Sequence, residues 1–182
     1  MTAKASEAVA AGKNPVPSDK MTAPIQVVEF VLGGEHFAID LFDVKEVVEY
    51  TTITKLPNVP SYVRGIIDLR GEITLIIDLR QRLNIGEERT TPLESSRIIV
   101  LDDRIARSKI GILVDDVTSV STFEGNQVDY TSASVSREET SIIGIIKRKG
   151  RVRDREINEL IIWIDIRQLL GDIDSSLTKQ AG

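Results

Sequence analysis

An internal repeat is the feature of this sequence that most constrains its fold. Three short segments of the first half recur in the same order in the second half. The matching segments are 44–47 with 117–120, 65–67 (Gly-Ile-Ile) with 144–146, and 77–83 (Ile-Asp-Leu-Arg-Gln-Arg-Leu) with 164–170. Three matches in one order favour a duplication over a chance similarity between isoleucine-rich strands. The sequence therefore predicts two copies of a small antiparallel barrel packed together.

The folded unit is expected to span residues 25–173. Residues 1–24 mix Ala, Lys, Ser and Pro with few large apolar side chains, so they cannot bury enough surface to offset the entropy of ordering them. We expect a disordered tail there and a flexible tail over 174–182. Within the folded unit, the repeat predicts barrels at roughly 37–95 and 96–160, with the terminal segments shared between them.

Runs of β-branched residues separated by turn residues predict a chain made mainly of strands. The segment 43–50 has some helical spacing, but its valines favour a strand. Pro57 and Pro60 predict a loop. The expected strands are 25–32, 36–41, 43–50, 66–69, 73–79, 97–101, 109–114, 117–123, 141–148 and 160–166, and the expected short helices are 80–83 and 165–170. The second copy is expected to carry an enlarged hairpin loop over 149–159.

Composition excludes several classes of function. The 182 residues include 28 acidic and 23 basic side chains, for a net charge of -5, which argues against general nucleic-acid binding. The absence of cysteine rules out disulfides and thiolate metal sites, and a single histidine rules out multi-histidine zinc sites. No apolar run approaches the roughly 20 residues of a spanning helix, so we expect no direct insertion into a membrane and a cytoplasmic location.

No group of residues predicts catalysis. His36 has no nearby Ser or Cys nucleophile pattern, and the chain has neither a phosphate-binding loop nor a dinucleotide fingerprint. The acidic pairs 102–103 and 115–116 could bind a divalent cation, but neighbours on a strand point to opposite faces and rarely converge. We therefore expect no enzyme activity, no cofactor and no metal.

Two polar features remain as candidate binding sites. The basic segment 147–156 could bind nucleic acid, anionic lipid or an acidic protein, or it could be a solvated hairpin tip neutralised by its own acids. The turn at Arg70-Gly71 could present a guanidinium to a protein partner, and Gly65 upstream could let another backbone approach closely, or these residues could be only the polar ends of strands. Because the repeat aligns Gly71 with Gly150, Gly71 is expected to be needed by the turn itself. It also aligns Arg70 with Lys149, so a basic residue at this position is not unique to one copy.

A series of motifs runs through the chain from 37 to 166. They are Phe37-Ala38-Ile39-Asp40, Val44-Lys45-Glu46-Val47, Leu56-Pro57 with Pro60, Val63-Arg64-Gly65, Asp68-Leu69-Arg70-Gly71, Ile77-Asp78-Leu79-Arg80, Gly111-Ile112-Leu113-Val114-Asp115-Asp116-Val117 and Trp163-Ile164-Asp165-Ile166. In this combination the chain resembles the CheW family of chemotaxis adaptors. It departs from the usual pattern in having Asp68 in place of Asn, no proline around Thr74-Leu75, and a longer, more basic hairpin at 149–159.

The resemblance implies a fold and a function. The fold would be all-β, with two packed five-stranded SH3-like barrels and short helices. The function would be that of a non-catalytic signalling scaffold, which links the cytoplasmic tips of chemoreceptors (methyl-accepting chemotaxis proteins) to the regulatory domain of a CheA-type histidine kinase in membrane-anchored arrays. A small barrel that binds nucleic acid or anionic lipid through the basic 147–155 hairpin is the alternative.

The resemblance also implies two sets of contact residues. The receptor-binding residues would be Glu46, Gly65, Arg70, Gly71 and Val117. The kinase-binding residues would be exposed apolar side chains of the first barrel, namely Val28, Leu41 and Val44.

Overall fold

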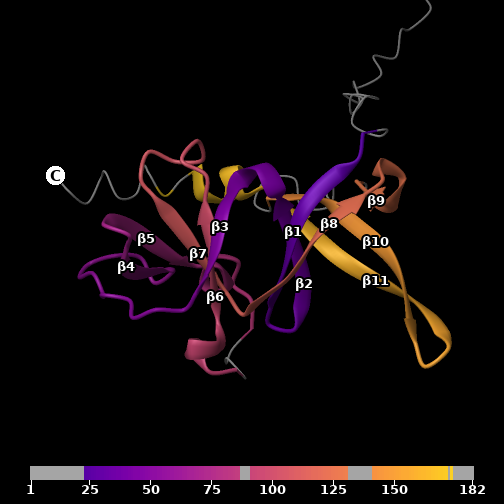
Figure 1. The fold of residues 1–182 in the computed structure, drawn as a ribbon, viewed down its shortest axis with the longest axis horizontal. Coiled ribbons are helices and arrows are strands. Elements are labelled where there is room, and N and C mark those ends of the chain that lie inside the picture. The colour runs from indigo at the N-terminus through magenta and orange to yellow at the C-terminus, as the bar shows by residue number, and fades with distance from the viewer. Residues whose placement is uncertain (1–22, 87–90, 131–140, 172, 174–182) are drawn as a thin grey trace, which may run out of the picture.

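The chain folds into two β-sheets that lie side by side (Figure 1). The computed structural model describes residues 23–86, 91–130, 141–171 and 173. In chain order the strands are β1 Ile25–Leu32, β2 Glu35–Asp40, β3 Val44–Glu49, β4 Val63–Leu69, β5 Glu72–Asp78, β6 Arg97–Leu101, β7 Ile110–Val114, β8 Asp116–Phe123, β9 Val128–Asp129, β10 Ile142–Val152 and β11 Arg155–Ile164. The sheet orders are β8-β1-β2-β11-β10-β9 and β3-β6-β7-β5-β4. The all-β prediction is confirmed, with six and five strands rather than five and five.

Short helical turns connect several strands, and aspartate side chains cap some of them. The 3-10 turn η2 (Leu41–Asp43) begins after Asp40, whose side chain accepts a hydrogen bond from the Phe42 backbone N–H. The helix α1 (Leu79–Arg82) begins after Asp78 in the same way. These caps end β2 and β5 one residue earlier than the sequence predicted. The remaining turns are η3 (Leu93–Ser95), η4 (Gly125–Gln127) and a helical stretch at 166–171.

The two sheets have matching topologies, which supports the duplication. The order β3-β6-β7-β5-β4 corresponds to β8-β1-β2-β11-β10, and each contains one parallel pair at the equivalent place, β5 with β7 and β11 with β2. Each sheet takes strands from both sequence repeats: the five-stranded sheet combines β3, β4 and β5 with β6 and β7, and the six-stranded sheet combines β1 and β2 with β8, β9, β10 and β11. The sheets therefore do not divide at residues 95/96 as expected, because β6 and β7 belong with β3, β4 and β5.

An ion pair stands near each point where the chain crosses between sheets. Arg80, at the start of α1, approaches Asp115, which lies between β7 and β8, at 3.4 Å. Arg167 lies in the helical stretch at 166–171, which corresponds to α1, and it approaches Asp43, between β2 and β3, at 2.7 Å. The repeated Ile-Asp-Leu/Ile-Arg motif thus supplies, in both copies, a helix cap and an arginine that ties down a crossover.

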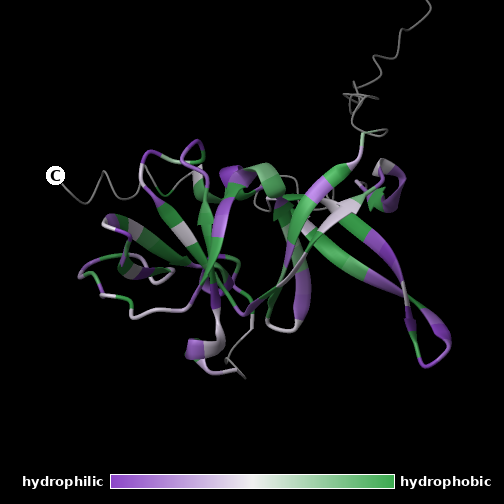
Figure 2. Cartoon of the chain, viewed as in Figure 1, coloured by the Kyte–Doolittle hydropathy of each residue, from purple (hydrophilic) through white to green (hydrophobic). Residues whose placement is uncertain are grey.

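The main hydrophobic core lies between the two sheets. It includes Phe30, Ile39, Ile77, Ile99 and Ile112, each with no exposed surface. Full burial of such a side chain contributes about 1.5 to 3 kcal/mol. Each sheet also has a smaller core of its own, and Figure 2 shows the hydrophobic colouring concentrated on the central strands of both sheets.

The predicted loop at 149–159 is instead a regular extension of the β10–β11 ladder, which corrects the expectation. Pairing continues to Val152 with Arg155, and the turn is made by Arg153 and Asp154 at φ 48° and 62°. Two positive φ values identify a tight hairpin turn. Gly150 lies within β10 opposite Ile157, so the glycine that the repeat aligns with Gly71 is not in a turn.

The predicted tails lie outside the described residues, apart from positions 23 and 24. In the part of the chain that the structure describes, no helix is long and apolar enough to cross a membrane.

Candidate functional site

A tight turn between β4 and β5 places Arg70 at the end of the five-stranded sheet. Leu69 pairs with Glu72, and the two residues between them have positive φ, 55° at Arg70 and 84° at Gly71. Asp68 accepts a hydrogen bond from the Gly71 backbone N–H at 2.7 Å. Asp68, which stands where the family pattern has Asn, therefore stabilises the turn. This hydrogen bond helps to hold Arg70 at a positive φ, which residues other than glycine rarely adopt.

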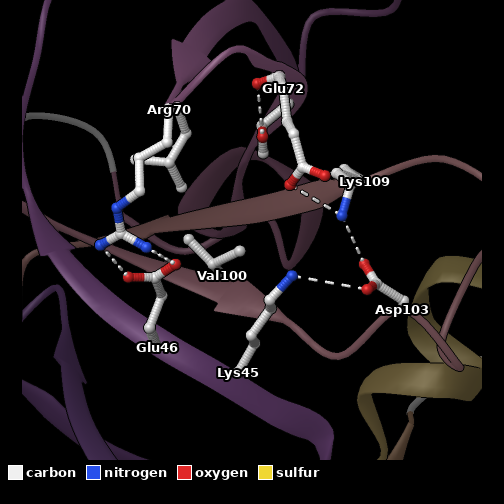
Figure 3. A pocket seen from close by; sticks show the side chains of 9 residues that line it. Lys45, Glu46, Arg70, Glu72, Val100, Asp103 and Lys109 are labelled. Atoms are coloured by element: carbon white, nitrogen blue, oxygen red, sulfur yellow. Dashed lines mark hydrogen bonds and ion pairs between the residues drawn. The ribbon is translucent and has the colours of Figure 1, made fainter.

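Arg70 forms a bidentate ion pair with Glu46 (Figure 3). Its Nη1 and Nη2 atoms donate to the two carboxylate oxygens of Glu46 at 3.0 and 2.7 Å. Glu46 lies on β3 and Arg70 follows β4, and these strands are the opposite edges of the sheet. The pair therefore joins the two edges at one end of the barrel. The Arg70 side chain is nevertheless 72% exposed, and an exposed pair contributes at most about 1 kcal/mol to stability.

A small hollow in the surface lies beside Arg70 and Glu46, and a second group of ion pairs lines it. Lys109 contacts Glu72 at 2.9 Å and Asp103 at 3.0 Å, and Lys45 contacts Asp103 at 3.4 Å, around the side chain of Val100 (Figure 3). Hydrogen bonds to Glu72 and Asp103 raise the pKa of Lys109, and the bond from Lys109 lowers the pKa of Asp103. Both shifts favour the charged forms, so these two groups keep their charges throughout the neutral range.

Gly65, expected at the receptor surface, is instead a buried contact inside the molecule. A Cβ at this position would overlap the carbonyl oxygen of Thr54, and φ is +141°. Thr54 forms an isolated β-bridge with Ile66, so the proline-containing loop rests directly on β4 here. The sequence had suggested that Gly65 admits another backbone, and that backbone is supplied by the chain's own Thr54.

Substituting Gly65 with alanine is expected to destabilise the fold. The added methyl group must displace the Thr54 backbone, and the positive φ adds strain, together about 2 to 4 kcal/mol. Thermal unfolding of Gly65→Ala measures the loss, with Gly171→Ala as the control because its Cβ meets nothing within 4 Å. An unchanged melting temperature for Gly65→Ala would contradict this role.

Val117 and Gly71 are not among the residues that line the hollow beside Arg70. Val117 lies on β8 of the six-stranded sheet, pairs with Phe30 and packs partly against the central core. Gly71 has open space where its Cβ would be, so the turn rather than packing requires a glycine there. The structure thus brings Arg70 and Glu46 together and has Gly71 in the same turn as Arg70, whereas Gly65 lies further along β4 and Val117 lies on the other sheet.

The predicted kinase residues are less exposed than the resemblance implied. Val28 is only 2% exposed and belongs to the central core, so the expectation that it is exposed is wrong, while its contact with a kinase stays a prediction. Leu41 and Val44 are partly buried against the same core. Between Leu41 and Val44, the exposed apolar side chain is that of Phe42, at 65%. Sequence reasoning missed Phe42 because it continued β2 through Leu41, whereas the Asp40 cap starts a helical turn there.

The six-stranded sheet has no equivalent of the Arg70–Glu46 pair. The matching ladders align Arg70 with Lys149 and Glu46 with Ser119, so the second position retains a cation without an acid. In the same alignment His36 corresponds to Lys109 and Glu159 corresponds to Glu72, and His36 and Glu159 lie 3.3 Å apart. The site is therefore a property of one barrel.

In the six-stranded sheet, a buried carboxylate lies at the position that corresponds to the hollow beside Arg70. Glu29 stands where Val100 stands in the other sheet, and its side chain is 1% exposed. Arg148, at the position of Leu69, donates to both Glu29 oxygens at 2.8 and 2.9 Å and also contacts Glu159. Burial lowers the pKa of Arg148, but its hydrogen bonds to Glu159 and Glu29 outweigh burial and raise the pKa overall.

Comparisons with known proteins agree on one family. Residues 26–174 match the CheW-like domain. The chemotaxis protein CheW of Treponema pallidum is 36% identical over 159 residues, which cover 85% of this chain and 86% of that protein. The chemotaxis protein CheW of Bacillus subtilis is 33% identical over 137 residues, covering 72% and 85%. The crystal structure of the scaffolding protein TtCheW from Thermoanaerobacter tengcongensis superposes with a TM-score of 0.65 at 33% identity, covering 81% of this chain and 93% of that one.

Proposed function

The chain belongs to the CheW family, and we propose that it is the non-catalytic scaffold that couples chemoreceptors to a CheA-type histidine kinase in a chemotaxis signalling complex. The observation that carries the proposal is the bidentate Arg70–Glu46 pair at the open end of the five-stranded barrel. Its exposure limits its value to stability, so an arginine held this firmly is better explained by recognition of a partner.

The proposed receptor surface centres on Arg70 and Glu46, with the Gly71 turn beside them. Gly65 supports this surface indirectly, because it seats the loop at Thr54 against β4. Val117, on the neighbouring sheet, would mark its edge. The cytoplasmic tip of a chemoreceptor is the proposed partner, with Arg70 as a directional donor to its carboxylate or carbonyl groups.

The proposed kinase surface centres on Phe42, with Leu41 and Val44 close to it in the chain and partly buried against the central core. Phe42 is held by η2, and Arg104 donates to its backbone carbonyl at 3.0 Å, so the ring stands on a fixed backbone. An exposed aromatic side chain on such a support suits the regulatory domain of the histidine kinase as an apolar anchor.

The two surfaces are joined by one strand. Val44 begins β3 and Glu46 lies two residues further along it, so a contact at one end bears on the strand that carries the other. Signalling by such a scaffold is a coupling free energy between two binding sites, not a chemical step. We place the protein in the cytoplasm at membrane-anchored receptor arrays, where many weak contacts reinforce one another.

Reconstitution with the receptors and the kinase of the same organism tests the proposal. Kinase autophosphorylation should become receptor-dependent only when this protein is added. Receptor control of the kinase without the protein, or none with it, would refute the coupling role.

Replacing Phe42 with glutamate is expected to weaken kinase binding by about tenfold and to leave receptor binding unchanged, since the side chain is exposed and an apolar anchor contributes about 1 to 2 kcal/mol. Titration calorimetry with the isolated kinase regulatory domain measures the first effect. Phe42→Leu keeps an apolar side chain and should bind nearly as well as the original protein. Equal losses for both partners would indicate a damaged fold instead.

A further inference from the structure

The extended hairpin is an addition to one barrel only. In the five-stranded sheet the ladder ends at Leu69 with Glu72, and the equivalent pair in the six-stranded sheet is Arg148 with Glu159. Residues 149–158 therefore stand where the other barrel has only Arg70 and Gly71. We call residues 149–158 the arm, and Figure 1 shows it projecting away from both sheets.

The arm has no role in the core that would explain its sequence. All of its residues are exposed except Gly150, which is half-buried. Beyond the barrel both of its edges are open, because β11 pairs with β2 only at Ile162 and Trp163, and β10 pairs with β9 only at Ile145 and Ile146. Its tight turn and continuous pairing nevertheless give it one defined shape.

The arm carries cations without partners in a protein that otherwise pairs most of them. Lys149, Arg151, Arg153 and Arg155 make no ion pair or side-chain hydrogen bond with the described residues. Elsewhere in the described chain, cations such as Lys45, Lys109 and Arg167 are engaged by carboxylates. A cluster of unpaired positive charge on an acidic protein is suited to attract a negatively charged partner.

The two faces of the arm differ. Cross-strand neighbours share a face, so Val152 and Ile157 lie on one side of the ribbon and Lys149 and Arg151 on the other. Val152 is 51% and Ile157 42% exposed, and Gly150 leaves space for the Ile157 side chain, which a Cβ would approach at 3.3 Å. Figure 2 shows the arm as mostly hydrophilic, with a hydrophobic segment near the turn.

The order of positive and negative side chains at the tip of the arm favours one class of anionic partner over others. Arg153, Asp154, Arg155 and Glu156 alternate in charge, so a uniformly anionic surface, such as a phosphate backbone or an anionic bilayer, would repel every second residue. A protein surface can place acids opposite the arginines and leave the arm's own acids in solvent. Two arms paired edge to edge would bring their cations together, which disfavours self-association.

We propose that the arm is a third docking surface, separate from the receptor and kinase surfaces, which binds an acidic protein surface with an apolar depression that accepts Ile157 and Val152. Arginines at the tip supply charge-assisted hydrogen bonds, and the two aliphatic side chains supply the apolar contact. The proposal goes beyond the coupling function, because that function uses residues of η2, β3 and the β4–β5 turn.

Site-specific photo-cross-linking of the full chain in its native cells tests the proposal. A benzophenone side chain at Val152 or Ile157 should cross-link to one protein, and the cross-linked segment should be rich in Asp and Glu. Arg153→Glu/Arg155→Glu changes the arginine in the turn and the one that shares the face of Val152 and Ile157, and should reduce the adduct about tenfold. The matched control, Lys55→Glu/Arg107→Glu, reverses two cations that are likewise exposed and unpaired in the described chain, and should leave the adduct unchanged.

A second variant separates the arm from the rest of the fold. Replacing residues 149–158 by Arg-Gly copies the turn of the other barrel, and should abolish binding to the cross-linked protein while receptor-dependent kinase activity persists. Adducts to lipid, to nucleic acid, to another copy of this chain or to a surface without acids would overturn the proposal. So would the absence of any adduct, an adduct that survives charge reversal, or binding that survives the arm replacement.

Discussion

Reversing the charge of Arg70 is expected to weaken receptor binding by about thirtyfold or more, which corresponds to about 2 kcal/mol. In Arg70→Glu the guanidinium that would meet the receptor is lost, and the new carboxylate faces Glu46, its former partner at 2.7 Å. Two carboxylates at one point of the surface repel each other and any acid of the receptor. Because the side chain at position 70 is mainly exposed, the fold should be retained. Receptor co-sedimentation measures the loss, and circular dichroism checks the fold.

The chain offers a close control for this reversal. Arg104 is 66% exposed and pairs with Asp102 at 2.6 Å, so Arg104→Glu changes the same charge in a similar setting away from the turn. Its receptor binding should stay within about twofold of the original, since Arg104 supports the Phe42 backbone on the proposed kinase surface and takes no part in the proposed receptor surface. Exchanging the pair, as Glu46→Arg with Arg70→Glu, tells apart two roles. If the exchange restores binding fully, Arg70 acts only as a brace between strands, and direct recognition is contradicted.

Local chemistry made much of the fold predictable. The short helices that follow Ile77-Asp78 and Ile164-Asp165, the Gly-Ile-Ile strands and the glycine turn at 71 depend on residues close in sequence, and the structure has all of them, with the helices within a residue of the expected positions. The failures involve partners distant in the chain. Nothing near residue 28 shows that β1 is covered by the opposite sheet, so Val28 was expected to be exposed. The exchange of strands between repeats is likewise decided by packing, not by any local pattern.

The candidate site was found only in part, for a related reason. The turn singled out Arg70, but its carboxylate partner lies on the opposite edge strand, and only the closure of the sheet brings Glu46 to it. Gly65 was assigned to the surface because a glycine can admit a backbone, and sequence alone does not tell an internal backbone from a partner's. Phe42 was missed because one capping aspartate changes which side chain faces solvent.

The two barrels carry different side chains at two equivalent positions. At equivalent positions one barrel holds Val100 and Leu69, and the other holds Glu29 and Arg148. The apolar pair leaves a shallow hollow edged by ion pairs beside Arg70, whereas the charged pair fills the corresponding place. Divergence at two positions thus separates a barrel end open to a partner from one occupied by internal contacts.

Removing the arginine of the charged pair is expected to destabilise the protein more than any surface change. Arg148→Leu leaves the Glu29 carboxylate, 1% exposed, without its hydrogen-bonding cation, and an uncompensated buried charge costs about 3 to 5 kcal/mol. Chemical denaturation should show that loss. Lys147→Leu is the adjacent control, because Lys147 is 56% exposed and its pair with Asp129 should contribute less than about 1 kcal/mol.

The double substitution Glu29→Val with Arg148→Leu should recover most of the loss, because it installs the side chains that the other barrel carries at those positions. Apolar replacements for a buried ion pair are often neutral or stabilising when the volume fits. Recovery would mean that the pair is dispensable for the stability of the barrel and that its removal hurts only through the orphaned acid. A double variant as unstable as Arg148→Leu alone would contradict the structural equivalence of the two barrel ends. It would instead assign the Glu29–Arg148 pair a packing role that apolar side chains cannot replace.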